Sequence, residues 1–540
     1  MTTVGKTATD SVSASGDAAA ATSLIVRSPL PDLDIPDMSV TDYAFRTAPD
    51  GADDVAIIDG VDGTLWTRGR LLDRMRRLAG GLVERGIGTG STVALMAGNS
   101  PEFAVVFHAV ALTGATLTPI NPTYRASEVG HQLDDAGVDL LIVDPQAAGS
   151  ASAAAAGRPV AVIGEPSFEE LMAEPIEQQT CDFRQSVAAL PYSSGTTGLP
   201  KGVMLTHRNV VANLAQLGAV SDFRRDDTAL LVLPMFHIYG LNAMLNAFLA
   251  HSVPFVTLPR FDLEQVLSLI QEHLVTRFFA VPPIMLALAR HPVVAEYDLS
   301  SLRSIACAAA PLGPELEQEV RDRIGCPVYQ AYGMTELSPL SHMVILPDVK
   351  PGSSGVTAPN TESLIIDDEG RPLGVDEVGQ VLVRGPQVMA GYLNNPEATA
   401  DTVDADGWLH TGDLARIDAD GHLFIVGRVK ELIKYNGFQV APAELEALLL
   451  DHPDVADVAV IGVPDVQVGE LPTAFVVTRP GRSVTSDAVI EYVADRVASY
   501  KRVRRVEFIT EIPKSAAGKI LRRELRAAAQ PLPADGSTPD

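Results

Sequence analysis

The stretch YSSGTTGLPKG, residues 192–202, follows the apolar segment VAALP and decides what kind of fold to expect. It carries four serine and threonine hydroxyls, three glycines and Lys201. Glycines let backbone N–H groups approach phosphate oxygens closely, hydroxyls add donors, and the lysine adds charge. A P-loop needs glycine directly before the lysine and serine or threonine after it, whereas Pro200 and Gly202 stand here. The stretch therefore predicts a polyphosphate-binding loop of another kind; the alternative is a surface loop of small polar residues.

The composition limits the classes of function. The chain has 540 residues, 46% of them apolar and 20% charged, which is typical of a globular protein with several domain-sized units. Lysine and arginine number 41 against 68 acidic residues, a net charge of −27, and such a surface repels nucleic acid. Three widely spaced cysteines argue against structural zinc and fit a reducing compartment. We therefore expect a cytoplasmic protein without a membrane span.

The N-terminal part has the sequence pattern of an α/β protein, in which strands and helices alternate. A strand-like run at 91–99 leads into a helical pattern at 100–115 and another strand at 116–120. Nearly continuous apolar runs rich in β-branched residues, typical of parallel strands covered on both faces, recur at 139–144, 228–234 and 253–259. The apolar stretch 103–120 is therefore expected to be a buried helix and strand.

The texture changes twice after residue 360. Residues 360–427 contain strands joined by Asp-Gly and Glu-Gly turns, which indicates antiparallel hairpins. From about 430 a compact α+β unit follows, with a second helix expected over 486–502. The predicted organisation is α/β, a large N-terminal domain of several subdomains with a smaller α+β cap. Its expected parts are a disordered tail at 1–23, domains at 24–429 and 430–527, and a second tail at 528–540.

Seven ordered blocks carry a resemblance to a known family. YSSGTTGLPKGVMLTHRN at 192–209 is followed by LPMFHIYGLN (233–242), AAAPLG (308–313), QAYGMTE (330–336), GWLHTGDLARID (407–418), GRVKELIKYNGFQVAPAELE (427–446) and PKSAAGKILRREL (513–525). Over about residues 24–526 the chain resembles the adenylate-forming superfamily of acyl-CoA synthetases, and most closely the 4-coumarate–CoA ligases. The resemblance implies a large N-terminal domain and a mobile C-terminal cap.

The resemblance also implies a reaction in two steps. MgATP activates a carboxylic acid as acyl-AMP with release of pyrophosphate, and the thiol of coenzyme A then displaces AMP. Because two anions must meet in the first step, fixed positive charge is the main catalytic requirement. Lys519 matches the family lysine that bridges the carboxylate and the α-phosphate, although a lone lysine in a polar segment is otherwise a solvated surface residue.

The resemblance assigns the nucleotide-binding residues by position. The phosphates would be held by Ser193, Ser194, Gly195, Thr196, Thr197, Lys201 and Thr335. The rest of the nucleotide would contact Ala309, Gln330, Gly333, Asp413, Arg428, Lys430, Gln439 and Lys519. Glu336 would hold Mg²⁺, or it is an acidic residue at a helix N-terminus. Asp413 would accept hydrogen bonds from the ribose, or it caps a turn after Gly412.

The second step requires other residues, which rotation of the cap would bring in. Lys430 occupies the family's hinge position, and Lys434, Gly437 and Gln439 would enter the site, with Lys434 in a catalytic role. Arg260 stands where the family places a lysine that contacts coenzyme A, so a cation is kept. Asn436 replaces a lysine of the family pattern, which leaves one contact with coenzyme A unmade.

The acyl-binding residues are small or apolar and carry no charge. The matched positions are Tyr239, Ala243, Ala306, Cys307, Ala308, Ala331, Pro339, Leu340 and Met343. Ala308 and Ala331 replace glycines and Ala243 replaces a serine, and the stretch 306–310 could equally serve packing. His237 would lie at the carboxylate end of this tunnel, or it is a core histidine. Cinnamate-like acids are the predicted substrates.

Three alternatives to this function remain open. The chain could activate medium-chain fatty acids, or it could deliver its acyl-AMP to a carrier protein or to oxygen. The third alternative is a non-catalytic nucleotide-binding or scaffold protein. The expected partners of the enzyme are ATP, coenzyme A, Mg²⁺ and an aryl or acyl carboxylic acid, with no nucleic acid.

Overall fold

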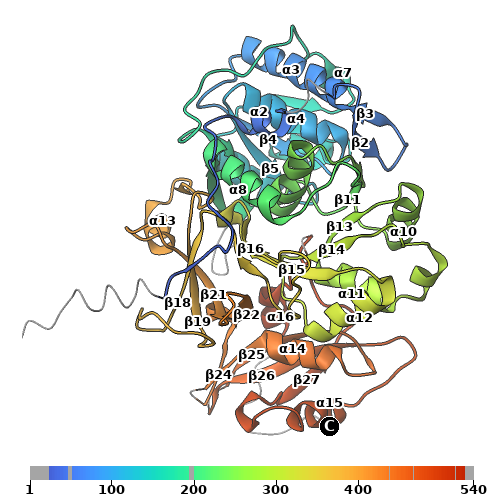
Figure 1. Cartoon of the computed structure of the whole chain (residues 1–540), viewed down its shortest axis with the longest axis vertical. Helices are drawn as coiled ribbons and strands as arrows, with labels where there is room; N and C mark the ends of the chain where they lie inside the picture. The colour runs from blue at the N-terminus through green and yellow to red at the C-terminus, as the bar shows by residue number, and fades with distance from the viewer. Residues whose placement is uncertain are drawn as a thin grey trace, which may run out of the picture.

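The computed structural model describes residues 24–46, 51–193, 200–436, 438–465, 467–516 and 518–529. Their strands form four sheets, two of them large and mostly parallel, with helices against their faces (Figure 1). The predicted α/β class with a smaller C-terminal unit is therefore confirmed. None of the helices in this part of the chain is long and apolar enough to cross a membrane.

The first large sheet holds the strands around the predicted phosphate-binding stretch. Its central strands β8, β5, β4, β6 and β7 are parallel, whereas β10 pairs antiparallel with β8, β9 and β20. In sheet order the strands are β20 (Gly391–Tyr392), β10 (Lys201–Thr206), β8 (Val187–Ala189), β5 (Thr116–Ile120), β4 (Thr92–Met96), β6 (Leu140–Val143) and β7 (Val160–Val162), with β9 (Tyr192–Ser193) beside β10.

The second large sheet carries the acyl-binding and QAYGMTE segments. Six neighbouring strands, β15 to β2 in sheet order, are parallel, and antiparallel strands close both edges. The order is β17 (Val356–Thr357), β16 (Leu340–Met343), β15 (Val328–Gly333), β14 (Ser304–Cys307), β13 (Arg277–Ala280), β11 (Ala229–Leu231), β12 (Phe255–Thr257), β2 (Val55–Asp59) and β3 (Leu65–Thr67).

Helix α4 (Pro101–Leu112) shows why the apolar stretch 103–120 is not a membrane span. Ser100 caps it by accepting a hydrogen bond from the backbone N–H of Phe103 at 3.3 Å, and Pro101 occupies the first turn. All but one of its residues are buried, and the chain then enters β5. The stretch is the predicted buried helix and strand.

The remaining helices before the cap cover the sheets or join them. They are α2 (Val40–Phe45), α3 (Arg68–Glu84), α5 (Ala126–Asp135), α6 (Ala148–Ala154), α7 (Pro166–Glu169), α8 (His207–Val220), α9 (Ala247–Ala250), α10 (Leu263–Glu272), α11 (Pro282–Arg290), α12 (Pro314–Ile324) and α13 (Pro396–Thr402).

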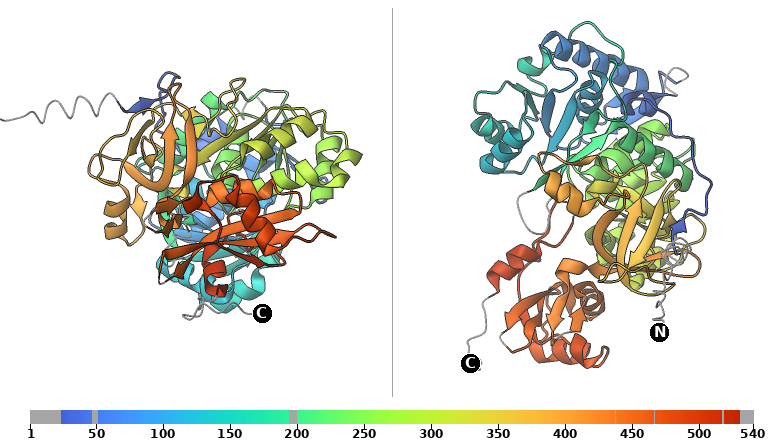
Figure 2. Two further views of the ribbon diagram at one scale, coloured as in Figure 1. Left: turned by 90° about the horizontal axis from the view of Figure 1, so that it is seen from below. Right: turned by 90° about the vertical axis from the view of Figure 1, so that its left-hand side faces the viewer.

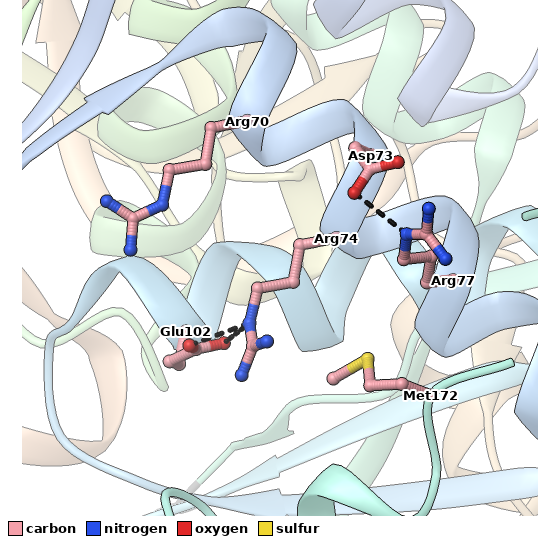
Figure 3. Close-up of a pocket in the computed structure, with 6 residues that line it drawn as sticks. All are labelled: Arg70, Asp73, Arg74, Arg77, Glu102 and Met172. Atoms are coloured by element: carbon pink, nitrogen blue, oxygen red, sulfur yellow. Dashed lines mark hydrogen bonds and ion pairs between the residues drawn. The ribbon is translucent and has the colours of Figure 1, made fainter.

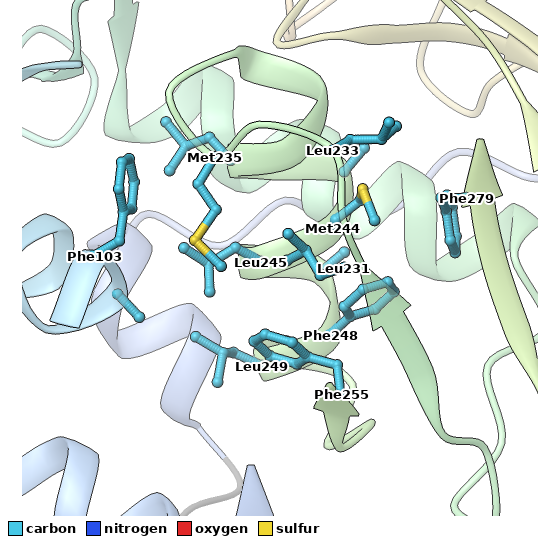
Figure 4. Close-up of a cluster of buried hydrophobic side chains, with 14 of the residues drawn as sticks. Phe103, Leu231, Leu233, Met235, Met244, Leu245, Phe248, Leu249, Phe255 and Phe279 are labelled. Carbon is cyan, nitrogen blue, oxygen red and sulfur yellow. The ribbon is translucent and has the colours of Figure 1, made fainter. Parts of the chain in front are cut away.

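A π-helix, η2 (Tyr239–Asn246), precedes α9 and runs into the core. Its wider turn is a feature that proteins often place at functional sites. Met244 and Leu245 from this segment, and Phe248 and Leu249 from α9, pack with Phe255 and the residues around it (Figure 4). The π-helix is therefore fixed from behind by a dense apolar core while its first residue, Tyr239, stays partly exposed.

A third sheet is antiparallel throughout, as the turn signals over 360–427 predicted. Its order is β1 (Val26–Arg27), β18 (Glu362–Ile366), β19 (Gly379–Arg384), β21 (Leu409–Ile417) and β22 (Leu423–Arg428).

The cap follows this sheet and forms a lobe of its own below the rest of the molecule (Figure 2). Its strands are β24 (Phe438–Val440), β23 (Ile433–Tyr435), β26 (Gly469–Thr478) and β25 (Val455–Asp465), with β27 (Arg505–Phe508) beside β26, and its helices are α14 (Pro442–Leu450), α15 (Ser486–Ala494) and α16 (Arg522–Ala528). The helix predicted over 486–502 is wrong in its length. It ends at Ala494, and a separate 3₁₀ turn covers Ser499–Lys501.

Candidate active site

Glu336 lies in a short 3₁₀ turn (Thr335–Leu337) directly after β15 and is buried. Its Oε1 accepts hydrogen bonds from the Ser193 hydroxyl at 3.1 Å and the Tyr392 hydroxyl at 2.8 Å. The Lys201 ammonium stands 4.7 Å from the centre of the Tyr392 ring. Two strands of the first sheet and the end of β15 thus converge at Glu336, which is also the acidic residue in the first turn of the 3₁₀ helix, so the alternative role as a helix-terminal charge stays open.

In the sequence, Ser193 and Lys201 flank the central part of the predicted phosphate-binding stretch. Ser193 pairs with Lys201 in an antiparallel register, and the Ser193 hydroxyl contacts Glu336. The predicted residues Ser194, Gly195, Thr196 and Thr197 lie outside the described residues. The described flanks place a hydroxyl, a carboxylate and an ammonium together, which is a suitable arrangement for phosphate with a cation.

Asp413 lies within β21 and is not a turn cap. Its Oδ1 accepts a hydrogen bond from Nε of Arg428 at 2.6 Å, and its Oδ2 accepts from the Tyr332 hydroxyl at 2.7 Å. Register explains the first contact, because Asp413 and Arg428 are opposite each other in the β21–β22 pair. Burial alone would lower the pKa of Arg428, but the Asp413 carboxylate raises it above its usual range. The carboxylate is held in a fixed orientation.

Lys519 from the cap reaches the same place. Desolvation lowers the pKa of Lys519, the charge of Arg428 lowers it further, and Asp413, Glu336 and Glu431 oppose this. The residue is nevertheless exposed to solvent. The residue before it, Gly518, would place a Cβ 3.2 Å from Val281 at the start of α11. The cap is thus docked with the charge of Lys519 within range of the charges of Arg428, Asp413 and Glu336.

His237 faces this cluster from the acyl side. Burial and then the charge of Lys519 lower the pKa of His237 to about 3, so its imidazole is neutral at physiological pH. Its Nδ1 accepts a long hydrogen bond of 3.4 Å from the backbone N–H of Tyr239. A small cavity is lined by Leu233, Pro234, His237, Tyr239, Gly240 and Val281. Its volume of about 10 Å³ holds at most one water molecule. His237 is therefore at the mouth of a nearly closed apolar space.

Most of the other predicted acyl-binding positions lie along the second sheet. Ala306 and Cys307 end β14, Ala331 is in β15, and Leu340 and Met343 bound β16. These side chains and Ala243 belong to the same apolar cluster, with Ala331 at its partly exposed margin. Pro339 precedes Leu340, and Ala308 and Ala309 follow Cys307, with Ala309 at a φ of 75°. Packing is therefore a role of Ala306 and Cys307 in this structure, and their predicted place in an acyl pocket stays a prediction.

Two residues predicted to contact the nucleotide, Gln330 and Gly333, make close contacts within the protein itself. The side-chain amide of Gln330 is fully used inside the protein, where it bonds Leu312 and donates to Oε2 of Glu317 at 2.9 Å. These hydrogen bonds to Leu312 fix the part of the chain that follows Ala309. Gly333 has no room for a side chain, because a Cβ there would lie 1.9 Å from the carbonyl oxygen of Pro339. Both residues shape the backbone of the site.

The structure does not bring the residues of the predicted second step to Lys519. Lys434 and Gln439 are opposite each other on the exposed β23–β24 hairpin, and Asn436 lies at its turn. Asn436 has a φ of 49°, a left-handed conformation that asparagine tolerates better than lysine. Gly437 lies outside the described residues. Lys430 is exposed in the 3₁₀ turn Val429–Glu431, and Arg260 is exposed after β12.

A larger hollow of about 390 Å³ lies elsewhere, against α3 (Figure 3). Arg74 binds Glu102 and Arg77 binds Asp73 there, so carboxylates already neutralise these guanidinium groups. Its lining residues are Arg70, Asp73, Arg74, Arg77, Glu102 and Met172. None of them belongs to the segments that surround Lys519, and we do not assign this hollow to the reaction.

Comparison with known proteins identifies the arrangement. A family model described as AMP-binding enzyme matches residues 45–393, and a model described as AMP-binding enzyme C-terminal domain matches residues 444–519. The chain belongs to the AMP-binding enzyme family. Among curated relatives, 4-coumarate–CoA ligase 5 of Oryza sativa subsp. japonica is 43% identical over 522 residues, which cover 93% of this chain and 97% of that protein. At this similarity the chain is an adenylate-forming acid–CoA ligase.

Solved structures of family members agree in fold. ATP-bound MatB from Rhodopseudomonas palustris is 30% identical with a TM-score of 0.85, and covers 91% of this chain and 99% of its own. The anthranilate–CoA ligase AuaEII with anthranoyl-AMP is 28% identical with a TM-score of 0.86, over 92% and 98%. Apo MatB gives a TM-score of only 0.74. The arrangement of this AMP-binding enzyme is thus nearer to that of the ATP-bound relative.

Three residues of the site were missed in the sequence. Tyr332 and Tyr392 hold the two acidic residues, and Phe279 packs edge-on against Tyr239 with ring centres 6.5 Å apart. Tyr332 could have been found, because it lies inside the QAYGMTE block. Tyr392 and Phe279 lie in apolar segments without a pattern of their own, and only the fold brings them to the site.

Proposed function

We propose that this AMP-binding enzyme is a 4-coumarate- or cinnamate-type CoA ligase, which forms the aryl-adenylate from MgATP and transfers the acyl group to coenzyme A. The observation that carries the adenylation step is the position of Lys519, which faces Asp413, Arg428 and Glu336 from the docked cap. The choice of acid rests on near full-length identity of 43% with 4-coumarate–CoA ligases.

In this proposal Lys519 neutralises charge as the carboxylate attacks the α-phosphate. Its ammonium would contact both anions, and Arg428 adds a second cation nearby. Ser193, Lys201 and Thr335 would bind the phosphates together with the loop at 194–199. The neutral His237 would face the carboxylate end of the acid, where it can donate or accept a hydrogen bond without adding a charge.

Glu336 fits the proposed magnesium ion. Oε1 is occupied by two hydroxyl donors, whereas Oε2 has no hydrogen-bond partner among the described residues. Mg²⁺ is commonly held by one or two carboxylates together with substrate phosphates. Across the described ranges no group of three or more histidine, cysteine or acidic side chains could hold a metal alone. Glu336 would therefore bind the ion only together with ATP, and the ion would neutralise phosphate charge.

For the second step we propose a rotation of the cap about Lys430, which would join domains at 24–429 and 430–527. Lys434, Asn436 and Gln439 are exposed on one hairpin of the cap in the adenylation arrangement. A rotation would exchange this hairpin for the Lys519 segment. Arg260 would remain on the large domain as a cation for coenzyme A.

The acyl pocket supports an uncharged, flat acid. Tyr239 and Phe279 form an aromatic wall, and the matched pocket positions carry no ionised side chain. A second carboxylate would be buried without a partner there, which is costly. The cavity is small in this structure, so an aromatic acid must displace Tyr239 or the first turn of the π-helix as it enters.

The test is AMP release with a panel of acids, coenzyme A and MgATP. We expect cinnamate and 4-coumarate to give thioester at higher kcat/KM than octanoate, malonate or acetate. Preference for octanoate would replace the aryl assignment. Acyl-AMP that accumulates without thioester in the presence of coenzyme A would replace the CoA-ligase assignment with delivery to another acceptor.

A first prediction concerns the size of the pocket. Ala308→Gly and Ala331→Gly remove methyl groups at positions where the resembled ligases have glycine, and should admit bulkier rings. We expect the ratio of kcat/KM for ferulate to that for cinnamate to rise by about 10-fold, which is the effect expected when one methyl-sized clash with the substrate is removed. The matched control is Ala215→Gly on α8, away from these strands. An unchanged ratio across cinnamate, 4-coumarate and ferulate in both variants would refute the pocket assignment.

A second prediction concerns the ribose. Asp413→Ala removes the proposed acceptor and leaves Arg428 without its carboxylate, so the KM for ATP should rise by about 10- to 100-fold. Tyr332→Phe removes one hydroxyl but keeps the Asp413–Arg428 pair, and should raise the KM for ATP only about fivefold. Steady-state kinetics with ATP varied at saturating acid measure both. Equal effects of the two variants would mean that Asp413 does not contact the nucleotide.

A further inference from the structure

The segment that carries Lys519 is a tight hairpin, and side-chain bonds fix both of its ends. The backbone N–H of Ser515 donates to the Lys519 carbonyl oxygen at 2.8 Å, and the N–H of Leu521 donates to the Pro513 carbonyl at 2.8 Å. Helix α16 starts at the next residue, Arg522. The lysine is therefore three residues from the first residue of a helix, and the position of that helix determines where the hairpin points.

Arg522 is nearly buried and binds two carboxylates at once. Its Nε donates to Oε2 of Glu431 at 2.9 Å. Its Nη1 and Nη2 donate to Oε1 and Oε2 of Glu446 at 2.6 and 3.0 Å, a bidentate pair. Glu446, on α14, also accepts from the backbone N–H of Val460 at 2.7 Å. Such forked contacts in a dry environment are strong and directional.

The two carboxylates have different places in the fold. Glu446 belongs to the cap's own helix, so its bond to Arg522 anchors α16 inside the cap. Glu431 lies in the 3₁₀ turn Val429–Glu431, next to Lys430 and three residues after Arg428. The side chain of Arg428 binds Asp413 in the large domain. One guanidinium therefore connects the Lys519 hairpin to the segment where the chain passes from one domain to the other.

The N-terminal end of the hairpin is bonded within the cap instead. Lys514 binds Asp457 on β25 at 2.5 Å, a contact that lies wholly within the cap. This contact holds the hairpin to the cap but does not involve the segment that joins the two domains. In the described part of the segment, it is the Arg522 end that bonds a residue next to Lys430.

We propose that Arg522 is a positioning residue for adenylation, and that its bond to Glu431 fixes the Lys519 hairpin to the interdomain joint so that the lysine is correctly placed when the cap is docked. This inference rests on the proposed function for its kinetic part. Arg522 itself does not touch the reactants: it is held away from them by Glu431 and Glu446, and acts through the backbone between Lys519 and Leu521.

The test uses variants of the full-length protein that keep the Glu446 anchor or the charge. Glu431→Gln removes the ionic bond at the joint and leaves the bidentate pair intact. Arg522→Lys keeps the charge but cannot fork to two carboxylates. The matched control is Arg523→Gln, which removes a positive charge at the neighbouring exposed position of the same helix.

Adenylation is measured as acid-dependent ATP–pyrophosphate exchange, and the second step as thioester formation from supplied acyl-AMP. We expect Glu431→Gln and Arg522→Lys to lower kcat for exchange by about 10- to 100-fold, because misplacement by about 1 Å has effects of that size. The KM for ATP, the thioester step and the melting temperature should stay within about twofold or a few degrees, as should all values for Arg523→Gln. Equal losses in both steps with a lower melting temperature would show a merely structural role.

Hydrogen exchange of the peptide 513–521, followed by mass spectrometry without substrates, tests the link independently of activity. We expect faster exchange in Glu431→Gln and Arg522→Lys and no change in Arg523→Gln. Unchanged exchange in the first two variants would overturn the proposal even if their kinetics were altered. If the wild type showed no exchange of pyrophosphate with any acid, the proposed function would fail, while the hydrogen-exchange result would still decide whether Arg522 fixes the hairpin.

Discussion

Lys519→Ala is expected to lower acid-dependent ATP–pyrophosphate exchange by about 100- to 1000-fold, the effect of removing one donor aimed at developing negative charge. The charges of Arg428, Asp413 and Glu336 all act on Lys519 from the large domain. At roughly 4 Å from a phosphate, an ammonium interacts by about 4 kcal/mol at an effective dielectric constant near 20. Alanine removes this charge and leaves the hairpin backbone unchanged.

The same variant should form thioester from supplied acyl-AMP and coenzyme A at a rate within about twofold of the wild type, because in the proposed rotation the second step uses the other face of the cap. The reciprocal control is Lys434→Ala. Lys434 is exposed on the β23–β24 hairpin in this arrangement, so it should spare exchange and slow thioester formation. Equal losses by Lys519→Ala in both assays would contradict the exchange of two cap faces.

Much of the scaffold could be predicted because its signals are local. The apolar run at 91–99 encodes β4, and the helical spacing after it encodes α4, since each pattern repeats within one element. Asp-Gly and Glu-Gly turns likewise located the antiparallel sheet. The helix expected to reach 502 failed for a local reason as well. Polar Asp495 and Arg496 continue the pattern, but the chain leaves the helix there and forms a 3₁₀ turn at 499–501.

The contacts that orient the site could not be predicted in the same way. Ser193 and Tyr392 are 143 and 56 residues away from Glu336, and no spacing in the sequence relates them. Gln330 shows the same limit from the other side. Its place in a recognisable block predicts a nucleotide contact, which stays a prediction, but nothing in the sequence indicates the hydrogen bonds of its amide to Leu312 and Glu317. A block identifies the neighbourhood of a residue, and the pairing of strands decides what its side chain touches.

Burial of neutral histidines should make the enzyme sensitive to mild acid. His108, His207 and His342 are completely buried, and desolvation alone lowers the pKa of these residues to about 3, 4 and 3. His207 accepts the backbone N–H of Val40 through Nδ1 at 3.2 Å, and His342 is surrounded by the hydroxyls of Ser341, Thr357 and Ser363. Among the residues that the structure describes, no carboxylate raises the pKa of any of the three.

The direction of the pH effect follows from these pKa values. A histidine in the unfolded chain has a pKa near 6.5. Below that pH the unfolded state binds protons that the folded state does not bind, so the stability of the folded state falls as the pH falls. At pH 5 each of the three histidines should cost about 2 kcal/mol relative to pH 8, or about 6 kcal/mol together. The loss grows until the pH reaches the folded pKa of each group.

Urea unfolding at pH 8 and pH 5 measures this difference, and single variants apportion it. His207→Gln and His342→Gln remove one titrating group each, so each should shrink the pH 8 to pH 5 loss by about 2 kcal/mol whatever it does to stability at pH 8. His131→Gln, on the partly exposed helix α5, is the matched control. If the variants at 207 and 342 lost as much stability between the two pH values as the wild type does, these imidazoles would have to accept protons in the folded state, and burial without a counter-charge would not be what keeps them neutral.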